Sequence, residues 1–292
     1  MIITATSLAA LTVAYNAAYN TGFAGVKPSW QMIATEIPST TAETTYAFLG
    51  SWPRLKEWLG ERQVKNLEAS GYSLRNKKFE ATVGVKAEDI EDDQAGVYKP
   101  MMQEVGRSAA VHPDEIVFEC LKNGFAAKCY DGAPFFGNHK VGKETVSNLQ
   151  AGAGAPWFLL DCSRSLKPLV FQKRRDYRFV SKTDPQKSDT VFNKDQYVYG
   201  VDARVNAGYG FWQMAYASKA ELTAANLRAA FMDMAELQDD QGKKLGIRPT
   251  ILVVPPEHEF AARDILFAER NDAGASNTNY KLVELLVTPY AA

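Results

Sequence analysis

The most reactive side chains of this 292-residue chain gather in one short stretch. Cys129, Asp131 and His139 supply a thiol, a carboxylate and an imidazole, groups from which many nucleophilic active sites are built. A glycine follows Asp131, as is typical of a tight turn, and two phenylalanines before the histidine are typical of a core. We therefore expect a structural turn and a hydrogen-bonded histidine on the surface or in a loop. A soluble hydrolase that uses these three residues is the enzyme alternative.

Three other motifs lack a part that their chemistry requires. His258 and Glu259 begin the pattern of a zinc-protease helix, but Ala262 stands where the second histidine ligand belongs. The glycine pair in AGAGAP lacks the third glycine and the strand-to-helix context of a nucleotide site, and is typical of a hinge or linker. The acidic run 88–93 lacks the spacing of a calcium loop and fits a solvated helix start. The sequence thus predicts no catalytic residue, no metal and no cofactor.

The most basic stretch is FQKRRDYRF at residues 171–179, where charges and aromatic rings alternate. Such a pattern is usually a half-buried strand, which is the favoured interpretation. A contact with a phosphate backbone or with an acidic patch of a partner is the other.

Composition excludes several classes of protein. The chain carries 33 basic and 34 acidic residues, a net charge of −1, and 46% of its residues are hydrophobic. This range is globular, and it lacks the positive excess of a polybasic nucleic-acid binder. The three cysteines form no C-x-x-C pair, which favours a reduced, cytoplasmic chain. Without a secretory pattern or a run of roughly 20 apolar residues, we expect a soluble protein of about two domains.

The amino-terminal segment predicts a short amphipathic helix with an uncovered face. Thr6 or Ser7 could cap it, and an apolar stripe follows at spacings of three and four: Leu8, Leu11, Tyr15 and Tyr19. Nothing nearby in the sequence covers that stripe. Residues 22–45 are rich in Gly, Pro, Ser and Thr, which indicates an extended arm.

The rest of the chain predicts an α+β protein without regular strand–helix alternation. The alternation in FEATVGVKAEDI indicates a two-stranded excursion. A long helix follows, with a break or a kink and then a restart at Pro113. Strands are expected across the middle, in TILVV and in KLVELLV. Helices are expected after Thr223 and in EHEFAARDILFAER.

This order of elements resembles the major capsid fold of tailed phages, the Hong Kong 97-type fold. Five stretches in order are similar to one family with that fold, the Mu-like major head subunits called gpT: GRSAAVHPDEIVFECLKNGF, YDGAPFFGNH, WFLLDCSRSLKPLVFQ, YGVDARVNAGYGFWQMAYASKAELTAAN and LGIRPTILVVPP. They cover most of the chain beyond residue 95, and as an ordered set they are specific.

The resemblance implies a division of the chain and a function. It implies an N-terminal arm (1–45), an extended loop reaching over a neighbouring subunit (46–93), the spine helix of a peripheral domain (94–130), and peripheral strands with an axial domain (131–292). The implied function is self-assembly of hexamers and pentamers into the icosahedral head that encloses the double-stranded DNA of a tailed phage. The alternative with the same fold is the shell of a cargo-enclosing nanocompartment.

The resemblance also implies where the protein acts and with what. It belongs in the virion after assembly in the host cytoplasm, with a scaffold or protease, a portal and decoration proteins as partners. DNA would be enclosed without sequence-specific binding, and no membrane is involved. Because large rigid side chains dominate interface energies, we expect these intersubunit anchors: Leu8, Leu11, Tyr15, Trp52 and Trp58.

Overall fold

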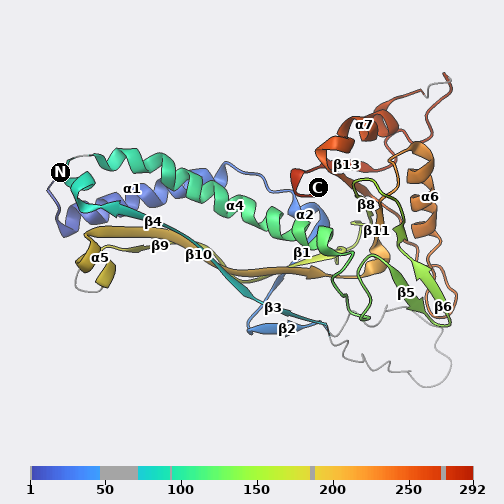
Figure 1. The fold of residues 1–292 in the computed structure, drawn as a ribbon, viewed down its shortest axis with the longest axis horizontal. Coiled ribbons are helices and arrows are strands. Elements are labelled where there is room, and N and C mark those ends of the chain that lie inside the picture. Colours follow the sequence, from blue (N-terminus) through green and yellow to red (C-terminus); the bar gives the residue numbers. More distant parts are fainter. Residues whose placement is uncertain (1, 47–71, 93, 185–187, 271–273, 292) are drawn as a thin grey trace. The chain divides into compact units, whose positions relative to one another are not determined.

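The computed structural model describes residues 2–46, 72–92, 94–184, 188–270 and 274–291 (Figure 1). These residues form two compact units. The first unit comprises Met1–Ser29, Asn76–Glu115 and Lys173–Asn206, and the second comprises Trp30–Arg75, Ile116–Gln172 and Ala207–Ala292. The chain passes between them within three elements: α4 (Tyr98–Asn123), β9 (Leu169–Lys182) and β10 (Gln196–Tyr209).

The first helix, α1 (Ala5–Ala24), is longer and begins earlier than the sequence predicts. Thr4 is the N-cap: its side chain accepts a hydrogen bond from the Ser7 amide at 3.1 Å, and the Ser7 hydroxyl accepts one from the Thr4 amide at 2.8 Å. This reciprocal pair satisfies two amides that would otherwise be unpaired. Residues 22–45 are also more regular than an extended arm, since they hold the end of α1, α2 (Trp30–Ile33), β1 (Ala34–Pro38) and β2 (Glu43–Thr45).

The apolar stripe of α1 is covered by its own chain, so the expectation of an uncovered face is wrong. Leu8 and Tyr15 belong to a buried cluster with Val85 of β4 (Lys77–Lys86) and Tyr199 of β10. Tyr15 is 1% exposed, and its ring meets that of Tyr199 edge-on at 5.0 Å. The sequence pattern identified the buried face correctly, but the strands that cover it lie far along the chain.

The long helix α4 runs through Pro113 as one helix, so the predicted helix is confirmed and a break with a restart is wrong. A kink at Pro113 stays a prediction. A proline inside a helix removes one backbone hydrogen bond and crowds the preceding turn. Buried residues anchor α4 on both sides of that point, among them Met102 and Val117, both fully buried. Packing therefore outweighs the local defect. Within the first unit, α1 and α4 lie side by side over β4 and β10 (Figure 1).

A four-stranded sheet has the order β1-β9-β10-β4. β10 and β4 are antiparallel, with Tyr199 opposite Val83 and Val201 opposite Ala81. The FEATVGVK segment is thus one long strand paired with a distant one. The two-stranded excursion stays a prediction, because residues 47–71 lie outside the described residues. The remaining short elements of the first unit are α3 (Ala87–Glu91), η2 (Gln94–Val97) and α5 (Asp189–Lys194).

The second unit is built on a five-stranded sheet of order β13-β12-β8-β11-β7. Its strands are β7 (Leu149–Gln150), β8 (Trp157–Leu160), β11 (Ala215–Ser218), β12 (Ile251–Val254) and β13 (Glu284–Val287). β8 is antiparallel to β11 and β12, and β12 is parallel to β13. All residues of β8, β11 and β12 are buried, as their apolar composition predicts.

Helices and small hairpins complete the second unit. α6 (Ala224–Ala235) packs on β11 and α7 (Glu259–Phe267) on β13. Thr223 caps α6 as predicted, accepting a hydrogen bond from the Asn226 amide at 3.2 Å. Two-stranded sheets join β2 to β3 (Ser73–Arg75) and β5 (Asn138–Val141) to β6 (Glu144–Ser147). Short helical turns are η3 (Trp212–Met214), η4 (Pro256–His258) and η5 (Pro289–Ala291).

The predicted α+β class is confirmed. The predicted domain boundaries stay a prediction, and most of the predicted loop, with Trp52 and Trp58, lies outside the described residues. Among the residues that the structure does describe, no helix combines the length and apolar character needed to cross a membrane.

Candidate functional site

The stretch with the most reactive side chains folds as a turn followed by a strand. Asp131 shapes the turn: its Oδ1 atom accepts hydrogen bonds from the Ala133 amide at 3.0 Å and the Cys129 thiol at 3.1 Å. Gly132 has a φ of 81°, a conformation that favours glycine. Phe135 and Phe136 are buried. The predicted turn and core phenylalanines are confirmed.

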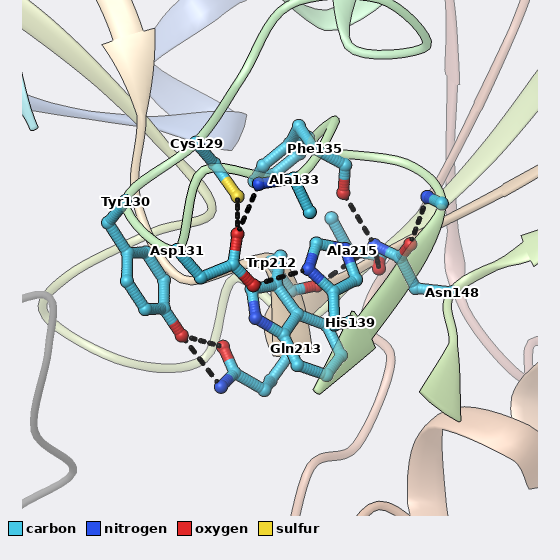
Figure 2. A network of polar contacts seen from close by, with 11 residues as sticks. Cys129, Tyr130, Asp131, Ala133, Phe135, His139, Asn148, Trp212, Gln213 and Ala215 are labelled. Carbon is cyan, nitrogen blue, oxygen red and sulfur yellow. Dashed lines mark hydrogen bonds and ion pairs between the residues drawn. The ribbon is translucent and has the colours of Figure 1, made fainter. Parts of the chain in front are cut away.

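His139 is fully buried and lies on β5, whereas the sequence predicted a surface or loop position. Its Nδ1 atom lies 2.6 Å from Oδ2 of Asp131, and its ring stacks on Trp212 with centroids 4.0 Å apart and planes 6° from parallel (Figure 2). Its Nε2 atom has no hydrogen-bond partner among the described residues. The carboxylate and the indole thus fix the imidazole from two sides.

Asn148 is the hub that fastens this stretch to the second unit's core (Figure 2). Its Oδ1 atom accepts from the Gly137 amide at 2.9 Å, and its Nδ2 atom donates to the carbonyls of Phe135 at 2.8 Å and Ala215 at 3.0 Å. The side chain is almost fully buried, so each of these groups would otherwise be an unsatisfied polar atom. The sequence analysis missed Asn148, because an isolated asparagine between two short strands gives no signal.

The geometry of these residues does not match a nucleophilic site. A cysteine nucleophile needs contact with an imidazole base, but the Cys129 thiol donates to Asp131, and Nδ1 of His139 is also bound to that carboxylate. Burial, with the hydrogen bond to Asp131 adding to it, raises the pKa of Cys129 to about 12, so the thiol stays protonated near neutral pH.

The pKa of Asp131 is shifted in the opposite direction. Burial opposes its ionisation, but hydrogen bonds from His139 and Cys129 outweigh burial and hold its pKa below the ordinary value. The three residues are therefore arranged around an ionised carboxylate, with both neighbours donating to it. This arrangement gives the hydrolase alternative no support.

The other predicted motifs have structural roles in the described residues. His258 sits at the start of α7, with Nε2 3.0 Å from the Ala155 carbonyl oxygen. The AGAGAP segment is tied to the chain before α6, since the Gly154 amide donates to the Lys219 carbonyl at 2.9 Å.

The basic stretch 171–179 lies entirely within β9, which confirms the strand interpretation. Arg175 and Arg178 both bind Asp202 on the neighbouring β10, at 2.6 and 2.7 Å. Two of the charges that suggested a phosphate contact are therefore paired within the sheet.

The proposed anchors divide into two groups. Leu8, Leu11 and Tyr15 come together, but they do so in the first unit's own core, where Leu11 is half-buried. In this conformation Leu8 and Tyr15 have almost no surface to offer another subunit, which corrects the reason for choosing them. Trp52 and Trp58 lie outside the described residues.

Large apolar side chains are exposed elsewhere instead. On α7, Phe260 is 77% exposed and Phe267 is 43% exposed, seven residues apart on the face opposite the buried Ala262 and Leu266. The first unit exposes Ile2, Val13 and Val97. The sequence analysis missed the α7 pair, although its heptad spacing was a usable signal.

The sequence is similar to known proteins over nearly its whole length. The family model of the Mu-like prophage major head subunit gpT matches residues 8–291. The chain belongs to the Mu-like major head subunit family. The major capsid protein of Escherichia phage Mu is 41% identical over 99% of this chain and 100% of its own length. The Mu-like prophage FluMu major head subunit of Haemophilus influenzae is 42% identical over 94% of each chain.

Solved structures confirm the predicted capsid fold of this Mu-like head subunit. A chain from the procapsid of bacteriophage JBD30 superimposes with a TM-score of 0.86 at 44% identity, covering 99% of this chain and 100% of that one. A chain from the JBD30 capsid gives 0.80 at 33% identity, with full coverage of both chains. The function that the sequence resemblance implied is likewise confirmed: this is a major capsid protein of a tailed phage.

Proposed function

We propose that this head subunit assembles into hexamers and pentamers that close an icosahedral shell around double-stranded DNA. The main support is the TM-score of 0.86 between this chain and a JBD30 procapsid chain, over 99% of the sequence. A fold that is shared over the whole chain includes the surfaces through which subunits build a shell. The work of the protein is then binding between copies, with no catalytic step.

Exposed apolar side chains support such contacts. Phe260 and Phe267 present two rings on one helix face, and large aromatic side chains are the residues that contribute most at protein interfaces. Burying them between subunits stabilises the shell by roughly 25 cal/mol for each Å² of apolar surface removed from water. Phe260 and Phe267 therefore join the proposed anchors of the sequence analysis, which stay a prediction: Leu8, Leu11, Tyr15, Trp52 and Trp58.

The partners of the shell are part of the same proposal. A capsid of JBD30 is decorated with minor capsid protein trimers, and the chain from that particle superimposes with a TM-score of 0.79 at 34% identity. We expect comparable decoration here, together with a scaffold or protease and a portal during assembly in the host cytoplasm. A net charge of −1 suits a wall that encloses DNA without holding it.

The test is expression of the full chain followed by sedimentation and measurement of nucleic acid in the particles. Rapidly sedimenting shells, filled with DNA when packaging proteins are supplied, would support the proposal. Shells that instead enclose a protein cargo would favour the nanocompartment alternative. A chain that sediments as a monomer at every concentration, also when its assembly partners are supplied, would refute both.

A further inference from the structure

We propose that Cys129, Asp131 and His139 form a binding site for a transition-metal ion, with Zn²⁺ as the natural candidate. Each offers one ligand atom, and these atoms lie within 4.8 Å of one another. A thiolate, an imidazole and a carboxylate together are the donor set of zinc and its neighbours, and Mg²⁺ and Ca²⁺ select oxygen ligands instead.

The present distances fit a site held closed by hydrogen bonds. Oδ1 of Asp131 is 3.1 Å from the Cys129 sulfur, and Oδ2 is 2.6 Å from Nδ1 of His139. Around a tetrahedral zinc ion the ligand atoms stand roughly 3.3–3.6 Å apart, from bonds of about 2.0–2.3 Å. The two separations from Asp131 must therefore grow by well under 1 Å, and the Cys129 sulfur and the His139 nitrogen, which lie within 4.8 Å of each other, must reach the same range for all three atoms to bind one ion.

Charge and burial favour occupation by a divalent cation. Cys129 and His139 are buried, whereas the side chain of Asp131 is 23% exposed, which leaves an approach for the ion and for a water ligand. A thiolate and a carboxylate carry two negative charges, which a divalent ion cancels within the site. Without the ion a buried thiolate is costly, which is why the thiol keeps its proton.

Binding of the ion displaces the thiol proton of Cys129. The Cys129 S–H bond breaks, its proton goes to buffer and a sulfur–metal bond forms. For a neutral imidazole, the hydrogen moves from Nδ1 to Nε2 so that Nδ1 can bind the ion. Because Nε2 has no hydrogen-bond partner among the described residues, this tautomer change breaks no existing bond there. One proton is released for each ion bound.

The surroundings already orient the ligands. Trp212 stacks on the imidazole at 4.0 Å, and the Ala133 amide holds Asp131 at 3.0 Å. Outer contacts of this kind commonly fix ligand geometry in metal sites. An ion here would lock the 129–139 turn against η3, independently of how the shell assembles.

The test is anaerobic titration of the full-length subunit with Co²⁺, followed by displacement with Zn²⁺. We expect one Co²⁺ per subunit, with visible d–d bands and a near-ultraviolet thiolate-to-cobalt band that Zn²⁺ abolishes. Cys129→Ser should lose the thiolate band, and Cys162→Ser, the matched control on another segment, should keep it. His139→Gln should retain the thiol but weaken Co²⁺ binding at least about tenfold.

Two results would overturn the site. One is a wild-type subunit that shows no thiolate band at excess Co²⁺ and retains no zinc by elemental analysis, which would make the three residues a metal-free hydrogen-bond network. The other is a band that persists in Cys129→Ser. If Cys129→Ser fails to fold, the wild-type titration and His139→Gln decide the question alone.

Discussion

Gly106 of α4 lies against the backbone of α1, where a Cβ atom would stand 2.0 Å from the carbonyl oxygen of Tyr19. The contact is reciprocal, since a Cβ on Gly22 of α1 would stand 1.9 Å from the carbonyl oxygen of Gln103 on α4. Real Cβ atoms do not approach backbone atoms so closely. The two helices of the first unit therefore pack backbone to backbone, and glycine is required at both positions.

Gly106→Ala should destabilise the subunit by about 1–3 kcal/mol. In an exposed helix alanine would gain about 1 kcal/mol over glycine, but here two helix backbones would have to separate. Urea unfolding of unassembled subunits measures the change. Gly96→Ala is the control, because a Cβ there meets nothing within 4 Å. Equal urea concentrations at the unfolding midpoint for Gly106→Ala and Gly96→Ala would contradict the close contact between the two helices.

Asn148→Ala should cost on the order of 3 kcal/mol or more. The substitution leaves the Gly137 amide and the carbonyls of Phe135 and Ala215 without the partner they have in the buried network. The free energy of unfolding is again the measurement. Asn138→Ala, at an exposed position on β5, should change it little. A loss below about 0.5 kcal/mol at Asn148 would show that the hub does not hold the turn.

The ion pairs of Asp202 predict a modest pH dependence. The hydrogen bond from Arg178, with Arg175 assisting against partial burial, lowers the pKa of Asp202 below its ordinary value of 3.8. This stabilisation is fully present above that value and is lost as the pH falls through the lower, folded-state pKa. Because Asp202 and its two arginine partners are partly exposed to solvent, water screens these ion pairs and their contribution to stability is small.

The check is the difference in unfolding free energy between the wild type and Asp202→Asn. It should be largest near neutral pH and shrink as the pH drops below 3.8. Arg178→Gln should reduce the same difference, which a double-mutant cycle would reveal. A difference that grows towards acid pH would have the wrong sign for this account.

Phe260→Asp should reduce the yield of shells at least about tenfold while the subunit stays folded. The ring is mostly exposed, so the fold loses little, but a charge would be placed where a neighbouring subunit is expected to pack. Electron microscopy counts the particles and circular dichroism reports the fold. Asp264→Asn, exposed on the same helix, is the matched control. Normal shell yield from Phe260→Asp would remove α7 from the proposed contacts.

Local sequence patterns predicted much of the fold, because helix caps, turns and apolar runs depend on residues that are neighbours in the sequence. The caps, turns and apolar runs located α6, β8, β12 and the Asp131 turn. The predictions that failed concerned contacts between residues far apart in the sequence. Tyr15 was assigned correctly to a buried face, but its covering partner Tyr199 lies 184 positions away in the chain, so the face looked uncovered. Pro113 was given too much weight for the same reason, since packing on both sides of it is tertiary.

The candidate site shows the same division. The types and order of Cys129, Asp131 and His139 were visible in the sequence, and the turn that joins them was predicted. The burial of His139 was not, because it depends on the stacking of Trp212, which lies 73 positions further on. Asn148 gave no signal at all. Its importance comes from three segments that meet only in the folded chain.

The central claim is that copies of this chain build a closed shell, and cryo-electron microscopy of the purified, full-length protein tests it most directly. The account predicts icosahedral particles whose wall consists of sixfold and fivefold clusters of this subunit, with Phe260 of α7 in contact with a neighbouring copy. A preparation that remains folded and monomeric at high concentration, in the presence of its assembly partners, would contradict it.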